Sequence, residues 1–288
     1  PMSGPRIAVC QLEVEPDVSA NLARIRRIAD DAAASGAELA LFPEASIYPI
    51  DAAAPELLTV AGLLETEIAP ALREIAAGLG TTLVVGVVEP SEQPGKVLNT
   101  VLVVAGDGSV VGAYRKMHLY DAFGSRESDR FVAGPPEPLA FDVGGCVFGI
   151  LTCYDVRFPE LARALVDRGV DALLVPAAWA HGIFKEEHWQ TLLRARAIES
   201  TVYVAGAGQC GPGLTGRSAI VVPSRSTKAY ISFVTTSVPS PTRWKTASSS
   251  TSGANSAVNV WCVTQTQPSP DIVPTRPDPV PRGHRPFT

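Results

Sequence analysis

The stretch CVFGILTCYDVRFPELARALVDRGVDALLVPAA, residues 146–178, joins two apolar runs through a segment with apolar residues at helical spacing. The runs at 146–153 and 171–178 predict strands, and the segment at 158–169 predicts a helix. Strands that alternate with helices are typical of an α/β fold, in which the sheet is largely buried. This stretch therefore predicts the fold class.

The same alternation extends in both directions along the chain. Upstream, the pattern predicts strands at 6–11, 38–42 and 81–90, helices at 21–37 and 67–79, and a hairpin at 97–116 that turns at Gly-Asp-Gly. Downstream, it predicts a helix at 186–200 and a strand at 201–208. The alternation ends near residue 223, so residues 1–223 are expected to form one domain.

Composition limits the possible function classes. The chain has 288 residues, 46% hydrophobic and 18% charged, as expected of a soluble globular protein. A net charge of −5 argues against nucleic acid as a partner, and no apolar run is long enough to span a membrane. Five cysteines without paired spacing, and no secretory signal, favour the reducing cytoplasm. The histidines and glycines form no metal or nucleotide motif, so no metal and no cofactor is expected.

Cys153 lies at the end of a predicted strand, just before a predicted helix. There it is either a small core residue or a nucleophile near a helix N-terminus, whose dipole would favour the thiolate. A Cys-His pair with His118 or His188 is an open alternative. Cys10, Cys146 and Cys262 are expected to be inert, and Cys210 lies in a glycine-rich loop.

Charged residues follow other predicted strands. Glu44 follows an apolar strand and a proline, where it is a loop carboxylate or a general base whose pKa is raised in a dry pocket. Lys116 follows the hairpin and either faces solvent or stabilises an oxyanion. Asp155 and Arg157, beside the cysteine, suit structural tasks: capping the next helix and pairing with a carboxylate.

Three motifs in order, LFPEAS (41–46), YRKMHLYDAF (114–123) and LTCYDVRFPEL (151–161), resemble the nitrilase superfamily of carbon–nitrogen hydrolases. Segments at 188–211 resemble its Nit-type amidases, the branch of omega-amidase and deaminated-glutathione amidase. The resemblance implies a four-layer α-β-β-α sandwich and a small-molecule amide as substrate. It also implies Glu44 as general base, Lys116 as oxyanion stabiliser and Cys153 as nucleophile. Glu127 would help to position the lysine and the substrate, and the Tyr154 backbone N–H would join the oxyanion hole.

Tyr154-Asp155 follows the nucleophile where nitrilases of the family usually carry Trp-Glu, so the resemblance favours an amidase. An N-carbamoyl amino acid hydrolase and a nitrilase are the alternatives, and an inactive truncated relative is a further one. Loops near 46–52 and 177–185 are expected to bind the rest of the substrate. Arg157 and Lys185 are the candidates for binding a substrate carboxylate.

Residues 224–288 depart from the rest of the chain. They contain no leucine, nine prolines and only two acidic residues, Asp271 and Asp278. This composition predicts a disordered tail. The resemblance implies a homodimer or larger assembly supported by a C-terminal segment that is not legible here. Residues 257–273, back-translated with G/C-leaning codons and read in another frame, resemble that segment, which suggests a frameshift between about residues 222 and 240.

Overall fold

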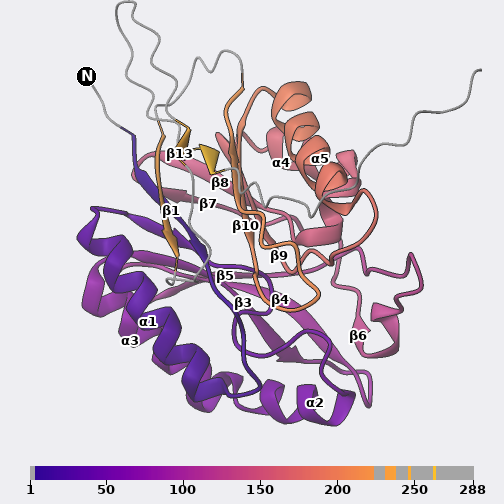
Figure 1. Cartoon of the computed structure of the whole chain (residues 1–288). Coiled ribbons are helices and arrows are strands. Elements are labelled where there is room, and N and C mark those ends of the chain that lie inside the picture. The colour runs from indigo at the N-terminus through magenta and orange to yellow at the C-terminus, as the bar shows by residue number, and fades with distance from the viewer. Residues whose placement is uncertain (1–3, 224–230, 238–245, 248–261, 264–288) are drawn as a thin grey trace, which may run out of the picture.

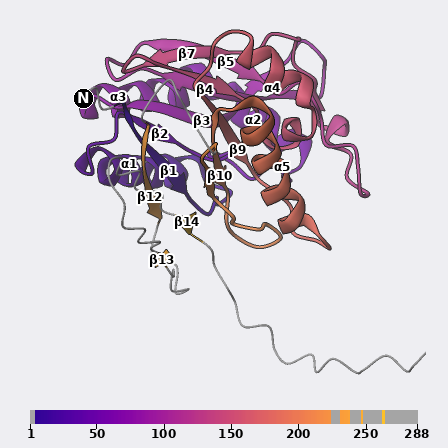
Figure 2. The same cartoon turned by 90° about the horizontal axis from the view of Figure 1, so that it is seen from above.

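Two sheets lie face to face with helices on their outer faces, in the order α-β-β-α (Figure 1). The computed structural model describes residues 4–223, 231–237, 246–247 and 262–263. The expected α/β class and four-layer sandwich are confirmed. The second view in Figure 2 shows α1 and α3 on the opposite side of the sheets from α4 and α5.

The first sheet has the strand order β12-β1-β2-β3-β4-β5, and β6 pairs with β4. Its strands are β1 (Arg6–Gln11), β2 (Leu39–Leu41), β3 (Thr82–Pro90), β4 (Val97–Val104), β5 (Val110–Arg115), β6 (Phe131–Val132) and β12 (Ser232–Ser237). Strands β4 and β5 form the predicted antiparallel hairpin. Three helices, α1 (Val18–Ala34), α2 (Ala54–Gly62) and α3 (Ala69–Leu79), accompany this sheet, with a π-turn at Leu64–Ile68 before α3.

The second sheet has the order β11-β10-β9-β8-β7. Its strands are β7 (Ala140–Val143), β8 (Cys146–Ile150), β9 (Ala172–Ala177), β10 (Tyr203–Gly208) and β11 (Ala219–Val221). Helices α4 (Pro159–Val166) and α5 (Lys185–Ser200) connect β8 to β9 and β9 to β10, and both pairs are parallel. The short strands β13 (Thr246–Ala247) and β14 (Cys262–Val263) pair with each other.

Alternate residues of β1 explain the layering. Ile7 and Val9 pack in the core that joins the two sheets, whereas Ala8 and Cys10 pack in the core beneath α1 and α3. Successive strand residues point to opposite faces, so a continuous apolar run buries both faces of the strand. All six residues of β9 and all six of β10 are buried, as this reasoning requires.

Helix α1 begins three residues earlier than its sequence pattern predicts. Asp17 is the N-cap and accepts a hydrogen bond from the backbone N–H of Ala20 at 3.0 Å. Asn21, the predicted start, is fully buried and donates to the carbonyl oxygens of Glu15 and Ile47. Its polar side chain therefore serves a tertiary contact rather than a cap.

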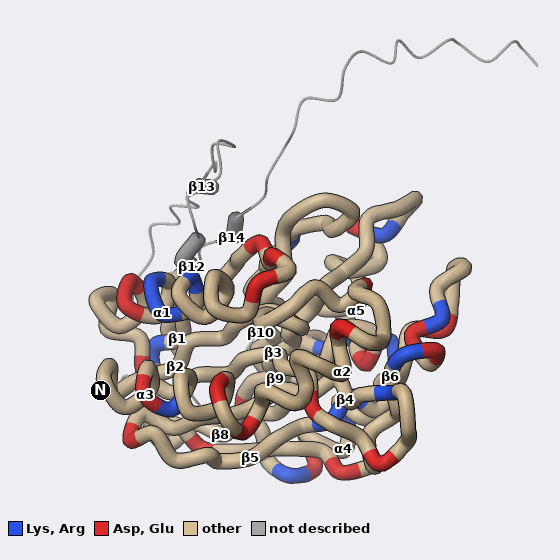
Figure 3. The backbone as a smooth tube through the Cα atoms, turned by 90° about the horizontal axis from the view of Figure 1, so that it is seen from below, with Lys and Arg blue, Asp and Glu red and all other residues tan. Residues whose placement is uncertain are grey.

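Strand β12 lies beyond the predicted domain boundary at residue 223 and pairs in parallel with β1 at the edge of the first sheet. Most of residues 224–288 lie outside the described residues, so the expectation of a disordered or frameshifted tail stays a prediction. In the described parts of the chain, no helix is long and apolar enough to cross a membrane. Figure 3 shows charges of both signs mixed along the outer helices and loops.

Candidate active site

Four predicted residues come together between the two sheets. Glu44 follows β2 and Lys116 follows β5, both in the first sheet, whereas Cys153 follows β8 in the second. Glu127 begins a short 3-10 turn, Glu127–Asp129, that leads into β6. All four side chains are buried and line one cavity.

A cluster of three charged side chains forms the floor of this cavity. Lys116 Nζ lies 2.9 Å from Glu44 Oε1 and 2.8 Å from Glu127 Oε2. The lysine is 2% exposed and Glu44 is 1% exposed, so water scarcely weakens these contacts. We call Glu44, Lys116 and Glu127 the charged floor.

Neutral donors complete the charged floor. The backbone N–H of Ala178 donates to Glu44 Oε2 at 2.7 Å, and the N–H of Tyr120 donates to Glu127 at 2.6 Å. Asn99 Nδ2, on β4, donates to both carboxylates at 2.8 and 3.1 Å. Sequence reasoning missed Asn99, although a polar residue within the apolar run VLNTVLVV is a usable signal.

The loop that carries Glu44 packs tightly against β3. A Cβ atom on Gly86 would lie 2.4 Å from the backbone nitrogen of Ala45 and 2.6 Å from the Pro43 oxygen. The N–H of Ser46 donates to the Gly86 carbonyl at 2.9 Å, and Gly86 N–H donates to Pro43 at 3.2 Å. Only glycine permits this approach, and the loop is thereby held in place.

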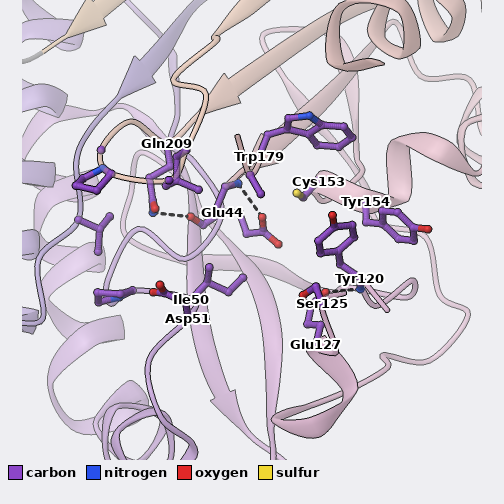
Figure 4. A pocket seen from close by; sticks show the side chains of 18 of the residues that line it. Glu44, Ile50, Asp51, Tyr120, Ser125, Glu127, Cys153, Tyr154, Trp179 and Gln209 are labelled. Atoms are coloured by element: carbon purple, nitrogen blue, oxygen red, sulfur yellow. Dashed lines mark hydrogen bonds between the residues drawn. The ribbon is translucent and has the colours of Figure 1, made fainter. Parts of the chain in front are cut away.

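Cys153 opens a 3-10 turn, Cys153–Arg157, and has a left-handed backbone with φ of 50°. Such a conformation is strained for a residue with a side chain, and strain of this kind clusters at functional sites. Cys153 is 9% exposed and lines the same cavity as the Glu44 carboxylate, whose negative charge acts on the thiol. Figure 4 shows the sulfur, the Glu44 carboxylate and the rings of Tyr120 and Trp179 around one space.

The protonation states in the cluster follow from burial and neighbouring charge. Burial raises the pKa of Cys153 well above its ordinary value, and the Glu44 carboxylate adds to the rise more than Lys116 offsets it. Burial alone would raise the pKa of Glu44, but the Lys116 charge and the Ala178 N–H hold it below its ordinary value. Burial disfavours the Lys116 ammonium, yet Glu44 and Glu127 raise its pKa well above the usual range.

Two sequence expectations are therefore wrong. The environment of Cys153 favours the thiol rather than the thiolate, and Glu44 has a lowered rather than a raised pKa. Burial and the neighbouring Glu44 carboxylate account for the thiol, and the 2.9 Å contact with Lys116 accounts for Glu44; the sequence shows neither. A neutral thiol beside an ionised carboxylate is the arrangement needed for general-base activation.

The cavity has a volume of about 280 Å³ and extends from the charged floor to the surface. Its walls come from distant parts of the chain: 13–14, 49–51, 120–130, 178–185 and 209–214. Both predicted substrate loops, 46–52 and 177–185, contribute residues to these walls. A volume of this order suits a small molecule.

Lys185 lines this cavity and is 7% exposed. Its ammonium donates to the Tyr120 hydroxyl and lies 4.4 Å from the ring centres of Tyr120 and Phe123 and 5.6 Å from that of Trp179. It pairs with no carboxylate among the described residues. We call Lys185 with Tyr120, Phe123 and Trp179 the cationic wall.

Arg157 has a different place and does not belong to the described lining of the cavity. Its guanidinium lies over the rings of Tyr154 and Trp179, at 5.7 and 5.4 Å from their centres, and contacts His188 Nδ1 at 3.3 Å. Within the described residues it meets no carboxylate, so the expected ion pair is wrong. Its buried Nε also lacks a partner there.

The remaining predicted residues have clear places. Tyr154 follows Cys153 in the sequence and also lines the cavity. Asp155 bonds the backbone N–H of Thr152, in its own turn, whereas α4 has no side-chain cap. His118 contacts Asp155, and His188 contacts Arg157, so the geometry favours Glu44 over a histidine as partner of the thiol. Among the described residues, no cluster of His, Cys, Asp or Glu is placed to hold a metal.

Comparison with known proteins agrees with this geometry. Residues 6–238 match the family model of the carbon–nitrogen hydrolases. Deaminated glutathione amidase from Escherichia coli O157:H7 is 41% identical over 192 residues, which cover 67% of this chain and 72% of that protein. The human protein of the same name is 34% identical over 216 residues, covering 72% and 65%.

Solved structures give the same result. An amidase from Nesterenkonia sp. superposes with a TM-score of 0.69 at 34% identity, over 78% of this chain and 84% of that one. The NitFhit protein of C. elegans gives a TM-score of 0.69 at 30% identity, over 77% and 57%. The chain therefore belongs to the carbon–nitrogen hydrolase family of the nitrilase superfamily, as a hydrolase of non-peptide carbon–nitrogen bonds.

Proposed function

We propose that the protein is an amidase in which Glu44, Lys116 and Cys153 hydrolyse a small carboxamide to an acid and ammonia. The observation that carries the proposal is that the Cys153 thiol and the Glu44 carboxylate line one cavity, with Lys116 Nζ 2.9 Å from that carboxylate. A nucleophile thus lies in the same cavity as the base and the cation of the charged floor, and this cavity suits the substrate.

The first half of the reaction forms a thioester. Glu44 takes the thiol proton while the Cys153 sulfur attacks the amide carbonyl carbon. The ammonium of Lys116 and the backbone N–H of Tyr154 stabilise the negative charge that develops on the carbonyl oxygen. Glu44 then returns its proton to the leaving nitrogen, the C–N bond breaks and ammonia departs.

The second half returns the free enzyme. Water enters the place of the departed ammonia, and Glu44 takes one of its protons as the oxygen attacks the thioester carbonyl. The C–S bond breaks, Glu44 returns the proton to the sulfur and the acid leaves. Glu127 positions Lys116 throughout, because it binds the ammonium with both of its oxygens, at 3.0 and 2.8 Å.

We propose further that the amide carries a carboxylate at its far end, bound by Lys185. Among the described residues this buried ammonium donates only to the Tyr120 phenol, so it has further donors to offer, and a carboxylate is the partner that offsets its burial. Arg157, whose guanidinium lies over the Trp179 ring, would add positive electrostatic potential to the carboxylate site. Deaminated glutathione amidases among the relatives support this substrate class, whereas a variant of the Nesterenkonia amidase was solved with the neutral butyramide.

We propose a cytoplasmic location, since Cys146, Cys153 and Cys210 form no disulfide among the described residues. A homodimer or larger assembly is proposed from the family alone. The frameshift hypothesis for the tail likewise stands as a proposal. Resequencing the gene across codons 222–240 tests it, and an unbroken frame that encodes this tail would refute it.

The experiment is an assay of ammonia release from ω-amides, aliphatic amides, nitriles and N-carbamoyl amino acids, with Cys153→Ala as control. We expect release from carboxylate-bearing amides that the substitution abolishes. Release from carbamoyl compounds or nitriles alone would replace the amidase assignment with one of its alternatives. No release from a folded protein would favour an inactive relative.

A further inference from the structure

Asp155 is a fully buried carboxylate that lies outside the charged floor. One of its oxygens accepts from the backbone N–H of Thr152 at 2.9 Å and from the Tyr114 hydroxyl at 2.7 Å. The other lies 3.0 Å from the backbone N–H of His118 and 2.7 Å from the His118 ring Nδ1. Since a carboxylate only accepts, that ring nitrogen must carry a proton.

These contacts join the two sheets at the reaction centre. Thr152 directly precedes the nucleophile after β8, in the second sheet. Tyr114 and His118 lie two residues before and two residues after Lys116, at the end of β5 in the first sheet. One carboxylate thus binds the segment of Cys153 and both flanks of Lys116.

The turn that carries the nucleophile, Cys153–Arg157, needs contacts of this kind to hold its backbone in place. Cys153 has a left-handed backbone, which costs free energy and persists only where neighbouring contacts fix it. Asp155 caps this turn, and the His118 ring stacks on Phe158, at the end of the turn, with ring centres 3.7 Å apart. The segment that carries Lys116 therefore packs against both ends of the turn that carries the thiol.

We propose that Asp155 is a positioning residue that sets the placement of the Cys153 thiol relative to Lys116 and Glu44. It touches neither the substrate nor the reacting atoms and acts through the backbone on both sides. The proposal rests on the proposed function for the roles of Cys153 and Lys116. When the contacts of Asp155 are broken, we expect kcat to fall while substrate binding stays unchanged.

The test is Asp155→Asn, with Tyr114→Phe as the matched control. Whichever oxygen becomes an amide NH₂, it faces a backbone N–H, of Thr152 or of His118, and that bond is lost. Tyr114→Phe removes one hydroxyl and leaves both backbone bonds. We measure kcat, KM, the melting temperature and the rate of Cys153 alkylation by iodoacetamide.

We expect Asp155→Asn to lower kcat by at least about tenfold, because small displacements of reacting groups are costly, with KM within about twofold. Alkylation of Cys153 should slow in parallel, and Tyr114→Phe should change kcat by no more than about threefold. A folded Asp155→Asn protein with parental kcat and alkylation rate would overturn the proposal. If the parent hydrolyses no amide, the proposed function fails while the alkylation rate still tests Asp155.

A second variant decides the matter if Asp155→Asn does not fold. Tyr114→Phe combined with His118→Phe keeps the ring stack on Phe158 and both backbone bonds but removes the two side-chain donors. A fall in kcat of about fivefold or more at constant KM would support the positioning role, since the carboxylate would then be held less firmly. Unchanged kcat and alkylation in this double variant would overturn it.

Discussion

The charged floor and the cationic wall bury similar groups in different ways. On the floor, Lys116 binds two carboxylates, and each carboxylate has further N–H donors. On the wall, Lys185 contacts three aromatic rings and the hydroxyl of one of them, Tyr120, but no carboxylate among the described residues. On the floor, every buried charge has a partner of opposite charge before the substrate binds. On the wall, the Lys185 ammonium gains such a partner only when a substrate brings an anion.

This difference separates two tasks. A floor that is complete beforehand does not need to reorganise as charge develops, which is what transition-state stabilisation requires. A wall that lacks its anion contributes to binding and to the choice of substrate. Changes in the floor should therefore affect kcat, and changes in the wall should affect KM.

The largest effect is expected for Cys153→Ala. Removal of a covalent nucleophile should lower kcat by at least about 10⁴-fold, as in other covalent hydrolases. Stability should change little, because the thiol is small and lies at the cavity surface. Ammonia release and thermal unfolding of the purified variant test both statements, and a variant that still turns over would remove Cys153 from the mechanism.

Glu44 should determine the acid limb of the pH profile. Its pKa is lowered, so the base stays ionised at neutral pH and loses its charge only below the ordinary value of 4.5. The free energy of folding that Glu44 contributes is likewise present above 4.5 and is lost as pH falls through the folded-state pKa. Glu44→Gln should lower kcat by about 10² to 10⁴-fold.

The profile of kcat/KM from about pH 3 to about pH 8, with folding monitored by circular dichroism, measures this limb, because the ordinary carboxylate pKa of about 4 lies inside that range. An acid limb near neutral pH in the folded enzyme would contradict a lowered pKa for Glu44. Parental activity in Glu44→Gln would show that another group takes the thiol proton.

Lys116→Met should combine a catalytic and a structural loss. Loss of an oxyanion donor lowers kcat by about 10² to 10³-fold. Glu44 and Glu127 would then face each other without a cation, and breaking a buried pair costs about 3–5 kcal/mol of unfolding free energy. Denaturant unfolding at neutral pH measures that cost, and Arg27→Met, at an exposed position on α1, is a control for loss of charge. Equal stability of the two variants would argue against a coupled floor.

Lys185→Met should affect binding. For a carboxylate-bearing amide we expect KM to rise about tenfold to a hundredfold, the value of a charge-assisted hydrogen bond. The KM for butyramide should hardly change. Arg157→Met is the matched control, since it removes a cation beside the same Trp179 but outside the described cavity lining, and its effect should be smaller. Equal effects on charged and neutral amides would refute the anion subsite.

The smallest effect is expected for Tyr120→Phe. The ring remains beside Lys185 and only the hydroxyl is lost, so KM for the charged amide should change by about twofold to fivefold. The backbone N–H of Tyr120 still binds Glu127, so kcat should stay constant. A loss in kcat instead of KM would place the hydroxyl in the reaction rather than on the wall.

Local sequence patterns predicted the elements well. Residues 146–178 form β8, α4 and β9 as expected, because their apolar spacing is strong and short loops join them. The pattern did not predict α2 at Ala54–Gly62 or the π-turn at Leu64–Ile68. The order of strands across the two sheets depends on long-range contacts that periodicity does not contain.

The candidate site shows the same limit. Glu44, Lys116, Glu127 and Cys153 were named from motifs, and all four line one cavity. Their protonation states were not foreseen, because the sign of the Glu44 shift depends on a 2.9 Å contact with Lys116. Asn99 bridges two carboxylates 55 and 28 residues away, which no local pattern reveals.

The most direct test is acid-quenched mass spectrometry of the enzyme during turnover of a carboxylate-bearing amide. A covalent thioester predicts a peptide containing Cys153 that is heavier by the acyl group and returns to its original mass when hydroxylamine is added. Cys153→Ala should show no such adduct. Rapid ammonia release without any adduct on Cys153, at every quench time, would contradict nucleophilic catalysis by this thiol.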